Sequence, residues 1–366
     1  MVTMAVNPPI FKIDNYMEDY ECDYIIGQAE KAGLFSSQLH IDPETLKSKN
    51  YTHKFVGYTS NFENFDLNKD NKLNLPDELQ KMAYRINYLY LNHKDIQDII
   101  EKFEIPVSEE NGDKYISRLD FDSINHQGMI MYFKDLREHH PHHRDRYSEQ
   151  VWLSVHRQDD KIFSKLMQRL EIATGLHKEI LYGTEPIQVV RYLSHGHYHA
   201  HFDSQNQSSF PNFPCCHTLS GGTAENCRIC RYMTALVYLN DVPKGGETSF
   251  PVADDPNYTH EEFLKRTKGD MYNLSQYCYN GSLVVSPKRG RLVMWYNHHV
   301  NEDGLLGILD PYSLHGGCDV IEGEKWIANN WIPAPETPNL LSQNVYKPNK
   351  SDMLDSHPFK AIKEDL

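Results

Sequence analysis

Residues 195–204 read HGHYHAHFDS, and this stretch decides how the rest of the chain is interpreted. In a β-strand alternate side chains share one face, so the histidines at 195, 197, 199 and 201 and the carboxylate at 203 are expected to project together. A histidine and an aspartate two positions apart on one face can bind a single ion. His315, in the run YSLHGGCDV at 312–320, is the candidate third ligand.

Two imidazoles and one carboxylate form the facial triad of non-haem iron(II) oxygenases, which leaves positions open for a cosubstrate and O₂. The triad expected here is His201, Asp203 and His315. The pair His-x-Asp alone is a weak signal, because such pairs are common on surfaces. A histidine-rich strand is also compatible with a structural site or a zinc site.

Lys325 lies ten residues after His315, in GEKWIANNW at 323–331. A strand of that length can place a buried ammonium at the far end of the same pocket, where it would pair with a dicarboxylate whose other end chelates the metal. An isolated lysine is usually exposed and without a role. In the company of the triad, the interpretation as a pocket residue is favoured.

The chain changes character at about residue 186. Short apolar or alternating runs separated by Gly, Pro and Asn predict the strands of a β-sandwich or barrel: PIQVVRYL (186–193), YMTALVYLN (232–240), GSLVVSP (281–287), RLVMWYN (291–297) and KWIANNWI (325–332). Upstream, YECDYIIGQAEKAGL (20–34) predicts a helix capped by Asp19 or Asp23, with Gly33 near its end. KIFSKLMQRLEIATGL (161–176) predicts an amphipathic helix.

The composition is that of an ordinary globular protein, with 39% hydrophobic and 24% charged residues in 366. The net charge of −14 argues against a general binder of nucleic acid, which would need a basic field. No apolar run approaches the ~20 residues of a membrane span. The first residues, MVTMAVNPPIFKIDNY, do not read as a signal peptide, so a lumenal location would require an upstream address.

Four of the seven cysteines crowd into CCHTLSGGTAENCRIC at 215–230. Disulfides among Cys215, Cys216, Cys227 and Cys230 are expected, while zinc bound by three of them with His217 is the alternative. Clustered cysteines fit an oxidising compartment. Asn-x-Ser/Thr sequons fit the same location: Asn50, Asn206, Asn257, Asn273, Asn280 and Asn349.

DLNKDNKLNLPD, at 66–77, has the spacing of an EF-hand calcium loop. The expected calcium ligands are Asp66, Asn68, Asp70, the carbonyl of Lys72, and Asp77. Leu73 occupies the apolar position 8. Asn71 replaces the usual turn glycine, which asparagine can do because it tolerates positive φ. Asp77 replaces the usual bidentate glutamate and is one methylene shorter.

EENGDKYISRLD, at 109–120, is a second and weaker candidate loop. With Ile116 at position 8, its ligands would be Glu109, Asn111, Asp113, Ser117 and Asp120. Lys114 stands where glycine is usual. The alternative for both loops is a paired helical scaffold that binds no calcium.

The catalytic motifs as a set resemble the prolyl 4-hydroxylase family, and the match extends over nearly the whole chain. The motifs are HYHAHFDS, RYMTALVYLNDVPKGGETSFPVAD, GRLVMWYN and YSLHGGC followed by GEKWIANNW. Within that family the chain resembles the endoplasmic-reticulum members that carry an EF-hand region. The resemblance implies an α+β fold whose catalytic core is a double-stranded β-helix, or jelly roll, with flanking helices and an EF-hand insertion.

The same resemblance implies four segments along the chain. Residues 1–53 would form an N-terminal strand and helix of the catalytic domain, and 54–135 an EF-hand-like pair. Residues 136–335 would form the dioxygenase core, and 336–366 a polar tail.

By this resemblance iron(II) is bound by His201, Asp203 and His315, and 2-oxoglutarate by Lys325 and Tyr192. Thr234 is a second candidate for the cosubstrate, and Glu247 is expected at the pocket rim. The implied reaction hydroxylates proline in a protein or peptide and converts 2-oxoglutarate and O₂ to succinate and CO₂. L-ascorbate and Ca²⁺ are further expected cofactors.

Hypoxia-inducible-factor α peptides are the family-based substrate guess, and collagen-like chains are less favoured because no peptide-binding repeat domain is visible. The expected location is the lumen of the endoplasmic reticulum, with membrane attachment only through an N-terminal anchor that this chain lacks. Two other functions compete with this one. They are a calcium-binding adaptor with an inactive jelly roll, and a zinc-dependent hydrolase with three protein ligands and an open water position. The presence of Lys325 weighs against both.

Overall fold

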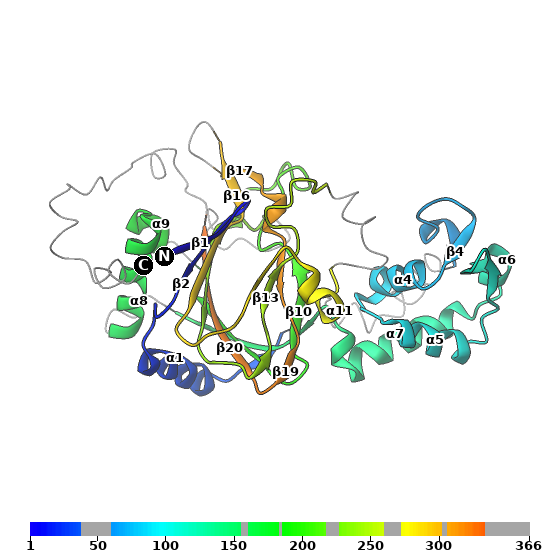
Figure 1. Cartoon of the computed structure of the whole chain (residues 1–366), viewed down its shortest axis with the longest axis horizontal. Coiled ribbons are helices and arrows are strands. Elements are labelled where there is room, and N and C mark those ends of the chain that lie inside the picture. The colour runs from blue at the N-terminus through cyan, green and yellow to red at the C-terminus, as the bar shows by residue number, and fades with distance from the viewer. Residues whose placement is uncertain are drawn as a thin grey trace.

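The computed structural model describes residues 1–37, 60–154, 160–182, 185–216, 227–259, 272–301 and 306–333. It contains both helices and sheets (Figure 1). The helices are α1 (Asp19–Ala32), α4 (Asp77–Asn87), α5 (His93–Lys102), α6 (Arg118–Asp122), α7 (His126–His139), α8 (Lys161–Thr174), α9 (Lys178–Tyr182) and α11 (Leu274–Tyr277), with short 3₁₀ turns η1 (Phe62–Asn64), η2 (Pro141–His143), η4 (Cys278–Asn280) and η5 (Pro311–Ser313).

Two antiparallel sheets build the catalytic half of the molecule. The major sheet has eight strands in the order β1 (Val2–Val6), β2 (Pro9–Ile13), β15 (Leu292–Tyr296), β11 (Arg231–Tyr238), β20 (Lys325–Pro333), β9 (Ile187–Tyr192), β8 (Glu149–Leu153) and β3 (Phe35–Ser36). The minor sheet has five, in the order β14 (Leu283–Val285), β13 (Thr248–Phe250), β18 (His315–Gly317), β10 (His197–His201) and β7 (Arg146–Tyr147). These facing sheets form the expected jelly roll.

Because side chains alternate along the strands of the major sheet, the two faces of this sheet contribute to two separate hydrophobic cores. Val190, Leu236 and Ile327 point between the sheets and pack with Phe250 and Trp295. Their chain neighbours Val189, Val237 and Trp326 point the other way, onto the buried faces of helices α1 and α8. Figure 1 shows α1, α8 and α9 together on that side of the barrel. Helices α1 and α8 therefore cover the outer face of the major sheet.

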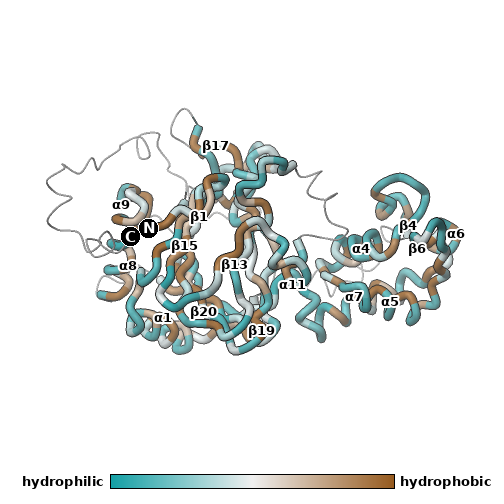
Figure 2. The backbone as a smooth tube through the Cα atoms, in the orientation of Figure 1, coloured by the Kyte–Doolittle hydropathy of each residue, from teal (hydrophilic) through white to brown (hydrophobic). Residues whose placement is uncertain are grey.

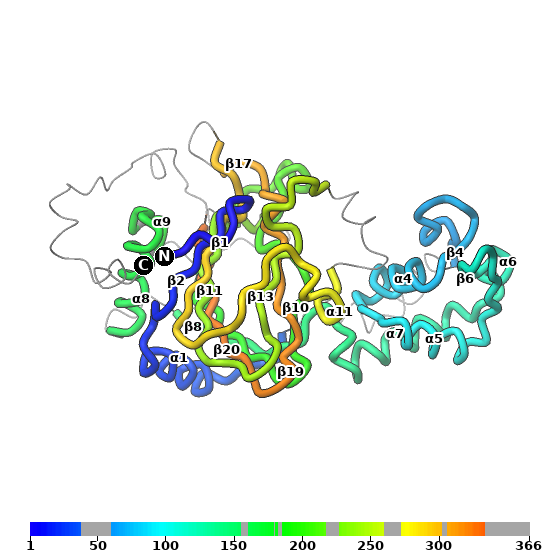
Figure 3. Tube along the Cα trace, in the orientation of Figure 1, coloured from blue at the N-terminus to red at the C-terminus, as the bar shows by residue number. Residues whose placement is uncertain are grey.

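A helical insertion with its own core stands at the opposite end of the molecule (Figures 1 and 3). Phe62, Phe65, Leu79, Ile96 and Phe133 are among its buried residues. Figure 2 shows that hydrophobic residues alternate with hydrophilic ones along its helices, as amphipathic packing requires. A three-stranded sheet closes it, formed by β4 (Lys72–Asn74), β6 (Asp113–Ser117) and β5 (Ser108–Glu110).

Two further short pairs complete the strand inventory. One joins β12 (Lys244–Gly245) to β19 (Val320–Glu322), and the other joins β16 (His298–Val300) to β17 (Leu306–Leu309). No helix in the described ranges combines the length and the apolar character needed to cross a bilayer.

Strand β10 departs from the regular alternation that the sequence predicts. Its register with β18 shifts between Tyr198 and His201, which marks a bulge. Tyr198 and His201 consequently face the space between the sheets, while His199 lies in the wall of a second cavity outside them. The expectation that His195, His197 and His199 project with His201 was therefore wrong, because one bulged residue inverts the alternation.

The strands and helices predicted from periodicity are present. The helix expected from residue 20 is α1, and Gly33 ends it at φ 85°. Its cap differs from the expectation, because Glu18 and Glu21 form a reciprocal capping box in place of Asp19 or Asp23. The helix expected at 161–176 is α8, which ends at Gly175. The predicted tail at 336–366 lies outside the described residues.

Candidate active site

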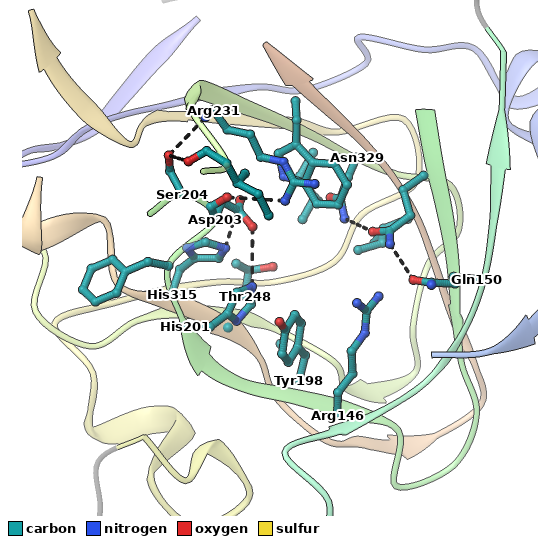
Figure 4. A pocket seen from close by; sticks show the side chains of 18 of the residues that line it. Arg146, Gln150, Tyr198, His201, Asp203, Ser204, Arg231, Thr248, His315 and Asn329 are labelled. Atoms are coloured by element: carbon teal, nitrogen blue, oxygen red, sulfur yellow. Dashed lines mark hydrogen bonds and ion pairs between the residues drawn. The ribbon is translucent and has the colours of Figure 1, made fainter. Parts of the chain in front are cut away.

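Three side chains from distant parts of the chain converge between the sheets. His201 ends β10, Asp203 follows it, and His315 opens β18 directly opposite His201 in the ladder. The Nε2 atoms of His201 and His315 lie 3.6 and 3.4 Å from the carboxylate oxygens of Asp203. One ligand atom from each residue lies within 4.8 Å of the others. Figure 4 shows the three side chains turned toward one another.

Backbone carbonyls fix the tautomer of both imidazoles. His201 Nδ1 lies 2.8 Å from the carbonyl oxygen of His199, and His315 Nδ1 lies 2.8 Å from that of Ser313. Each Nδ1 must donate its hydrogen there, which leaves a lone pair on each Nε2 facing Asp203. This is the state in which imidazole binds a metal.

The protonation states of Asp203 and His315 also favour the binding of a cation. Burial alone would raise the pKa of Asp203, but the nearby imidazoles of His315 and His201 hold it well below its usual value. Burial lowers the pKa of His315 to about 4. At neutral pH the cluster thus presents one carboxylate and a neutral imidazole at His315, a donor set suited to a divalent transition metal.

Thr234 does not line the pocket where the cosubstrate was expected. Its hydroxyl donates to Asp203 Oδ2 at 2.7 Å, and it accepts a hydrogen from Asn297 Nδ2 at 2.9 Å. Because Asn297 already donates to the Thr234 oxygen, the threonine hydrogen is committed to Asp203. Thr234 and Asn297, both almost fully buried, therefore hold the carboxylate of Asp203 in one orientation.

Lys325 is buried at the base of the same pocket, with 1% of its surface exposed. It faces Tyr192 across the β20–β9 ladder, and its Nζ lies 5.2 Å from the Tyr192 ring centroid and 5.6 Å from that of Tyr238. Burial lowers its pKa to about 7, against a weaker opposite effect of the Glu247 carboxylate. Within the described ranges no carboxylate lies within 4.0 Å of this ammonium. Such a group calls for an anionic partner from outside the chain.

Thr248, which the sequence interpretation overlooked, lines the pocket beside Lys325. Its hydroxyl oxygen lies 2.6 Å from the Tyr238 hydroxyl, which also lies 3.3 Å from the carbonyl oxygen of Val285. Glu247, expected at the rim, is not among the lining residues. It accepts a hydrogen bond from Tyr279 at 2.9 Å on the far side. Glu247 directly precedes Thr248, the first residue of β13, and adjacent residues of an extended chain face opposite sides. Thr248 therefore faces the pocket and Glu247 does not.

The pocket has a volume of about 540 Å³, and a stack of three side chains forms part of its wall. The Tyr198 ring lies parallel to His201 with centroids 3.6 Å apart, and the Arg146 guanidinium lies 4.7 Å from the Tyr198 centroid. Figure 4 shows Arg146 and Tyr198 together on one side of the pocket. The sequence did not single out either residue, because the bulge that turns Tyr198 inward leaves no trace in the pattern.

In the first acidic loop, side-chain carboxylates accept hydrogen bonds from the backbone amides of the same loop. Asp66 accepts hydrogen bonds from the amides of Asp70 and Asn71 at 3.1 and 3.0 Å, and Asn71 adopts φ 62°, as expected for the residue in the glycine position. Glu78 is buried and accepts from the amides of Leu67 and Asn74 at 2.7 and 2.8 Å. The carboxylate turned into this loop is therefore that of Glu78, one residue beyond the predicted Asp77.

The second acidic stretch does not form an open loop. Glu109 pairs with Lys114, and Glu110 with Asp113, in a tight hairpin whose turn residues Asn111 and Gly112 both have positive φ. Asp120 accepts a hydrogen bond from Ser117 at the start of α6. Leu73 and Ile116 pair across β4 and β6, as the two loop registers require. The second calcium site, with Glu109, Asn111, Asp113 and Asp120, stays a prediction.

The cysteine-rich loop is closed by two disulfides, Cys215–Cys230 and Cys216–Cys227. A third, Cys278–Cys318, joins η4 to the residue after β18 and was not predicted. Cys22 is buried and free. The four loop sulfurs are therefore not available to zinc, and the disulfide expectation is confirmed.

Comparison with known proteins places this geometry in a family. The model of the 2OG-Fe(II) oxygenase superfamily matches residues 187–333, which include all three converging ligands and Lys325. Transmembrane prolyl 4-hydroxylase of Mus musculus is 33% identical over 98% of this chain and 71% of its own length. The protein of that name from Homo sapiens is 34% identical over the same shares.

The chain belongs to the transmembrane prolyl 4-hydroxylase family of 2OG-Fe(II) oxygenases. It is thus an oxidoreductase that uses iron(II) and 2-oxoglutarate. Among solved structures, the viral collagen prolyl hydroxylase of Paramecium Bursaria Chlorella virus-1 with 2-oxoglutarate aligns with 88% of this chain and 94% of its own, at 17% identity and a TM-score of 0.39. Family membership sets aside the calcium adaptor and the zinc hydrolase as accounts of the whole chain.

Proposed function

We propose that this oxygenase hydroxylates C4 of proline in a polypeptide and that His201, Asp203 and His315 hold its iron. The convergence of these three side chains, with both Nε2 lone pairs facing one carboxylate, is the observation that carries the proposal. Iron(II) bound there would supply activation of O₂. The overall reaction balances as peptidyl-proline, 2-oxoglutarate and O₂ giving peptidyl-hydroxyproline, succinate and CO₂.

Lys325, Tyr192 and Thr248 would bind the cosubstrate. The distal carboxylate of 2-oxoglutarate supplies the anion that the buried Lys325 ammonium lacks, and the hydroxyl of Thr248, which lines the same pocket, would donate to the same group. Tyr192 lies opposite Lys325 on the neighbouring strand, and the Lys325 Nζ is 5.2 Å from its ring centroid. A charge-assisted contact of this kind fixes the cosubstrate so that its keto acid end reaches the triad.

The polypeptide would enter past Arg146 and Tyr198. The Tyr198 ring is stacked on His201 and carries the Arg146 guanidinium over it, so Arg146 offers guanidinium hydrogens, which suit peptide carbonyls. Hypoxia-inducible-factor α is one candidate source of the peptide. L-ascorbate is proposed as the reductant that keeps the iron in the iron(II) state between turnovers.

The function is tested by incubating the full chain with iron(II), 2-oxoglutarate, ascorbate and a panel of proline-containing peptides. Mass spectrometry should show the gain of one oxygen atom on a proline, with succinate formed in equal amount. Hypoxia-inducible-factor α and collagen-like peptides belong in the panel. Succinate formation without oxygen gain on any proline of any peptide would contradict the proposal.

Replacing Thr234 by Val should weaken metal binding about 10- to 100-fold, as the loss of an outer hydrogen bond to a metal ligand typically does. The reason is that Asp203 loses the donor that holds its carboxylate in place. Thr234→Ser keeps the hydroxyl and should restore most of the affinity. Competition against a chelator measures the constant, and equal affinity in the Val and wild-type proteins would rule out this positioning role.

We also propose that the loop at 66–78 binds calcium with Glu78 as its last ligand. Burial and the charges of Asp66 and Asp70 raise the pKa of Glu78, the behaviour of a carboxylate cluster that lacks its cation. The amide bonds to Glu78 already place its carboxylate at the loop. The 13-residue span, closed by Glu78, replaces the usual 12-residue loop.

Calcium should raise the melting temperature of the wild-type chain, by the equivalent of about 2.7 kcal/mol at one hundred times its Kd. Glu78→Gln should lose most of this stabilisation, because it removes the charge turned into the loop. Asp77→Asn is the matched control and should retain it. If the Asp77 variant lost the effect and the Glu78 variant kept it, the twelve-residue interpretation would be correct instead.

The disulfides support a location in an oxidising compartment, and we place the chain in the lumen of the endoplasmic reticulum. The relatives are named as transmembrane proteins.

A further inference from the structure

A second cavity, of about 640 Å³, lies on the outer side of β10, opposite the iron pocket. Its walls come from the helical insertion, from the residues before and within β10, and from α11. Most of the residues that line it carry a polar group, among them Asn92, Asp95, His142, His195, Gln276 and Asp319. Cavities of this size at the seam between two structural units commonly bind ligands.

Two buried atoms in this wall lack hydrogen-bond partners. His199 Nδ1 accepts a hydrogen from the Leu274 amide at 3.1 Å, so the neutral ring carries its hydrogen on Nε2. That Nε2 hydrogen has no acceptor, and Asn273 Oδ1 has no donor, although the two side chains are only 2% and 5% exposed.

An unused donor beside an unused acceptor matches the hydrogen-bonding groups of a peptide. A buried polar group without a partner is destabilising, so a ligand that supplies both partners gains affinity. Each of the two atoms exposes less than 1 Å², so the side chains must rotate toward the cavity before a peptide carbonyl accepts from His199 and a peptide amide donates to Asn273. A metal is a poorer match, because in the described part of the chain no three ligand atoms of this cavity lie within 4.8 Å of one another.

The two cavities share a wall. On β7 the side chain of Arg146 lines the iron pocket and that of Tyr147 lines the second cavity. On β10 the same division separates Tyr198 from His199. Strand β7 is the edge of the minor sheet and only two residues long, so a chain leaving the iron pocket can pass around it.

We propose that this second cavity is an exosite for the substrate polypeptide and binds an extended segment that flanks the target proline. The proposal rests on the proposed prolyl hydroxylase function. One sheet layer is ~10 Å thick, and an extended chain rises about 3.3 Å per residue, so the bound segment lies roughly three to six residues from the proline. The enzyme then recognises two separate parts of one substrate.

The test compares a short and a long version of the best peptide from the panel. The short one has two residues on either side of the proline, and the long ones extend it by ten residues on one side or the other. Wild-type kcat/KM should be several-fold higher for one of the long peptides. Gln276→Ala, at an exposed position in the cavity wall, and Asn273→Ala should each raise KM for that peptide about 2- to 12-fold, the equivalent of one lost hydrogen bond.

The short peptide reports on the iron pocket alone, and its kcat and KM should not change in either variant. Gln127→Ala, an exposed glutamine on α7 outside both cavities, is the matched control. Equal kcat/KM for short and long peptides, or equal losses on both in the Gln276 variant, would overturn the exosite while leaving the hydroxylase intact. Absence of turnover with every peptide would instead reject the hydroxylase function, and the exosite with it.

Discussion

Replacing His315 by Ala should reduce 2-oxoglutarate turnover by more than about 100-fold, because loss of an outer partner of a metal ligand already costs 10- to 100-fold. The variant leaves only His201 and Asp203 at the site. It also removes an imidazole that contacts the Trp295 and Phe250 rings at centroid distances of 4.5 and 5.8 Å. Succinate formation and bound iron per chain are the two measurements.

His139→Ala is the control for this experiment, since His139 is an exposed histidine at the end of α7, remote from the metal cluster. It should keep both iron and turnover. His315→Gln, which retains a polar side chain of similar length, separates loss of the ligand from loss of packing. Full iron content in both His315 variants would show that the metal lies elsewhere.

Replacing Lys325 by Met should raise the KM for 2-oxoglutarate by about 100-fold or more, as expected when one partner of a buried ion pair is removed at a cost of about 3–5 kcal/mol. Iron affinity without the cosubstrate should not change, because Lys325 does not contact the triad. The same substitution should raise the melting temperature of the cosubstrate-free chain, since it replaces a buried ammonium that lacks a counter-ion. A variant less stable than the wild type, with unchanged KM, would contradict this role.

The pKa of Lys325 sets opposite pH trends for the free and bound proteins. It is about 7 in the folded chain, against ~10.4 when unfolded. Between these values the unfolded chain binds more protons, so the free energy of unfolding without cosubstrate should rise with pH across this window. Below pH 7 the buried ammonium destabilises the folded chain fully, and this effect no longer changes with pH. Binding of 2-oxoglutarate needs the ammonium and should weaken by up to about tenfold per pH unit above 7. Lys325→Met should abolish both trends.

Much of the site could be predicted because its spacing is encoded locally. The pair His201 and Asp203, the separate run with His315, and Lys325 ten residues later are visible as motifs, and the structure places all four in one pocket. The strands were equally readable, since apolar runs bounded by turn residues leave little choice of conformation.

Features that depend on a single residue's register were not predictable. Because of the bulge in β10, His199 lies on the face opposite to the one that the alternation predicts. At the start of β13, Thr248 lines the pocket and its neighbour Glu247 does not. Thr234 looked like a cosubstrate contact because its strand crosses the pocket. Only the structure shows that its hydroxyl donates its hydrogen to Asp203.

The acidic stretches show a second limit of spacing rules. The motif counts twelve residues from Asp66 to Asp77, but α4 begins so that Glu78 is the residue turned into the loop. In the second stretch Asn111 and Gly112 favour a tight hairpin turn, which competes with an open metal-binding loop. In both stretches the local turn residues, and not the motif spacing, therefore determine which side chains face the loop.

We expect His201, Asp203 and His315 to bind iron(II), 2-oxoglutarate to chelate that iron, and Lys325 to hold the other end of the cosubstrate. Anaerobic titration with iron(II) and 2-oxoglutarate, followed by the visible charge-transfer absorption of the chelate, measures this directly. One iron and one cosubstrate per chain should produce the band, His315→Ala should abolish it, and Lys325→Met should shift it to much higher 2-oxoglutarate concentrations. A band of wild-type intensity and midpoint in the His315→Ala protein would contradict the account.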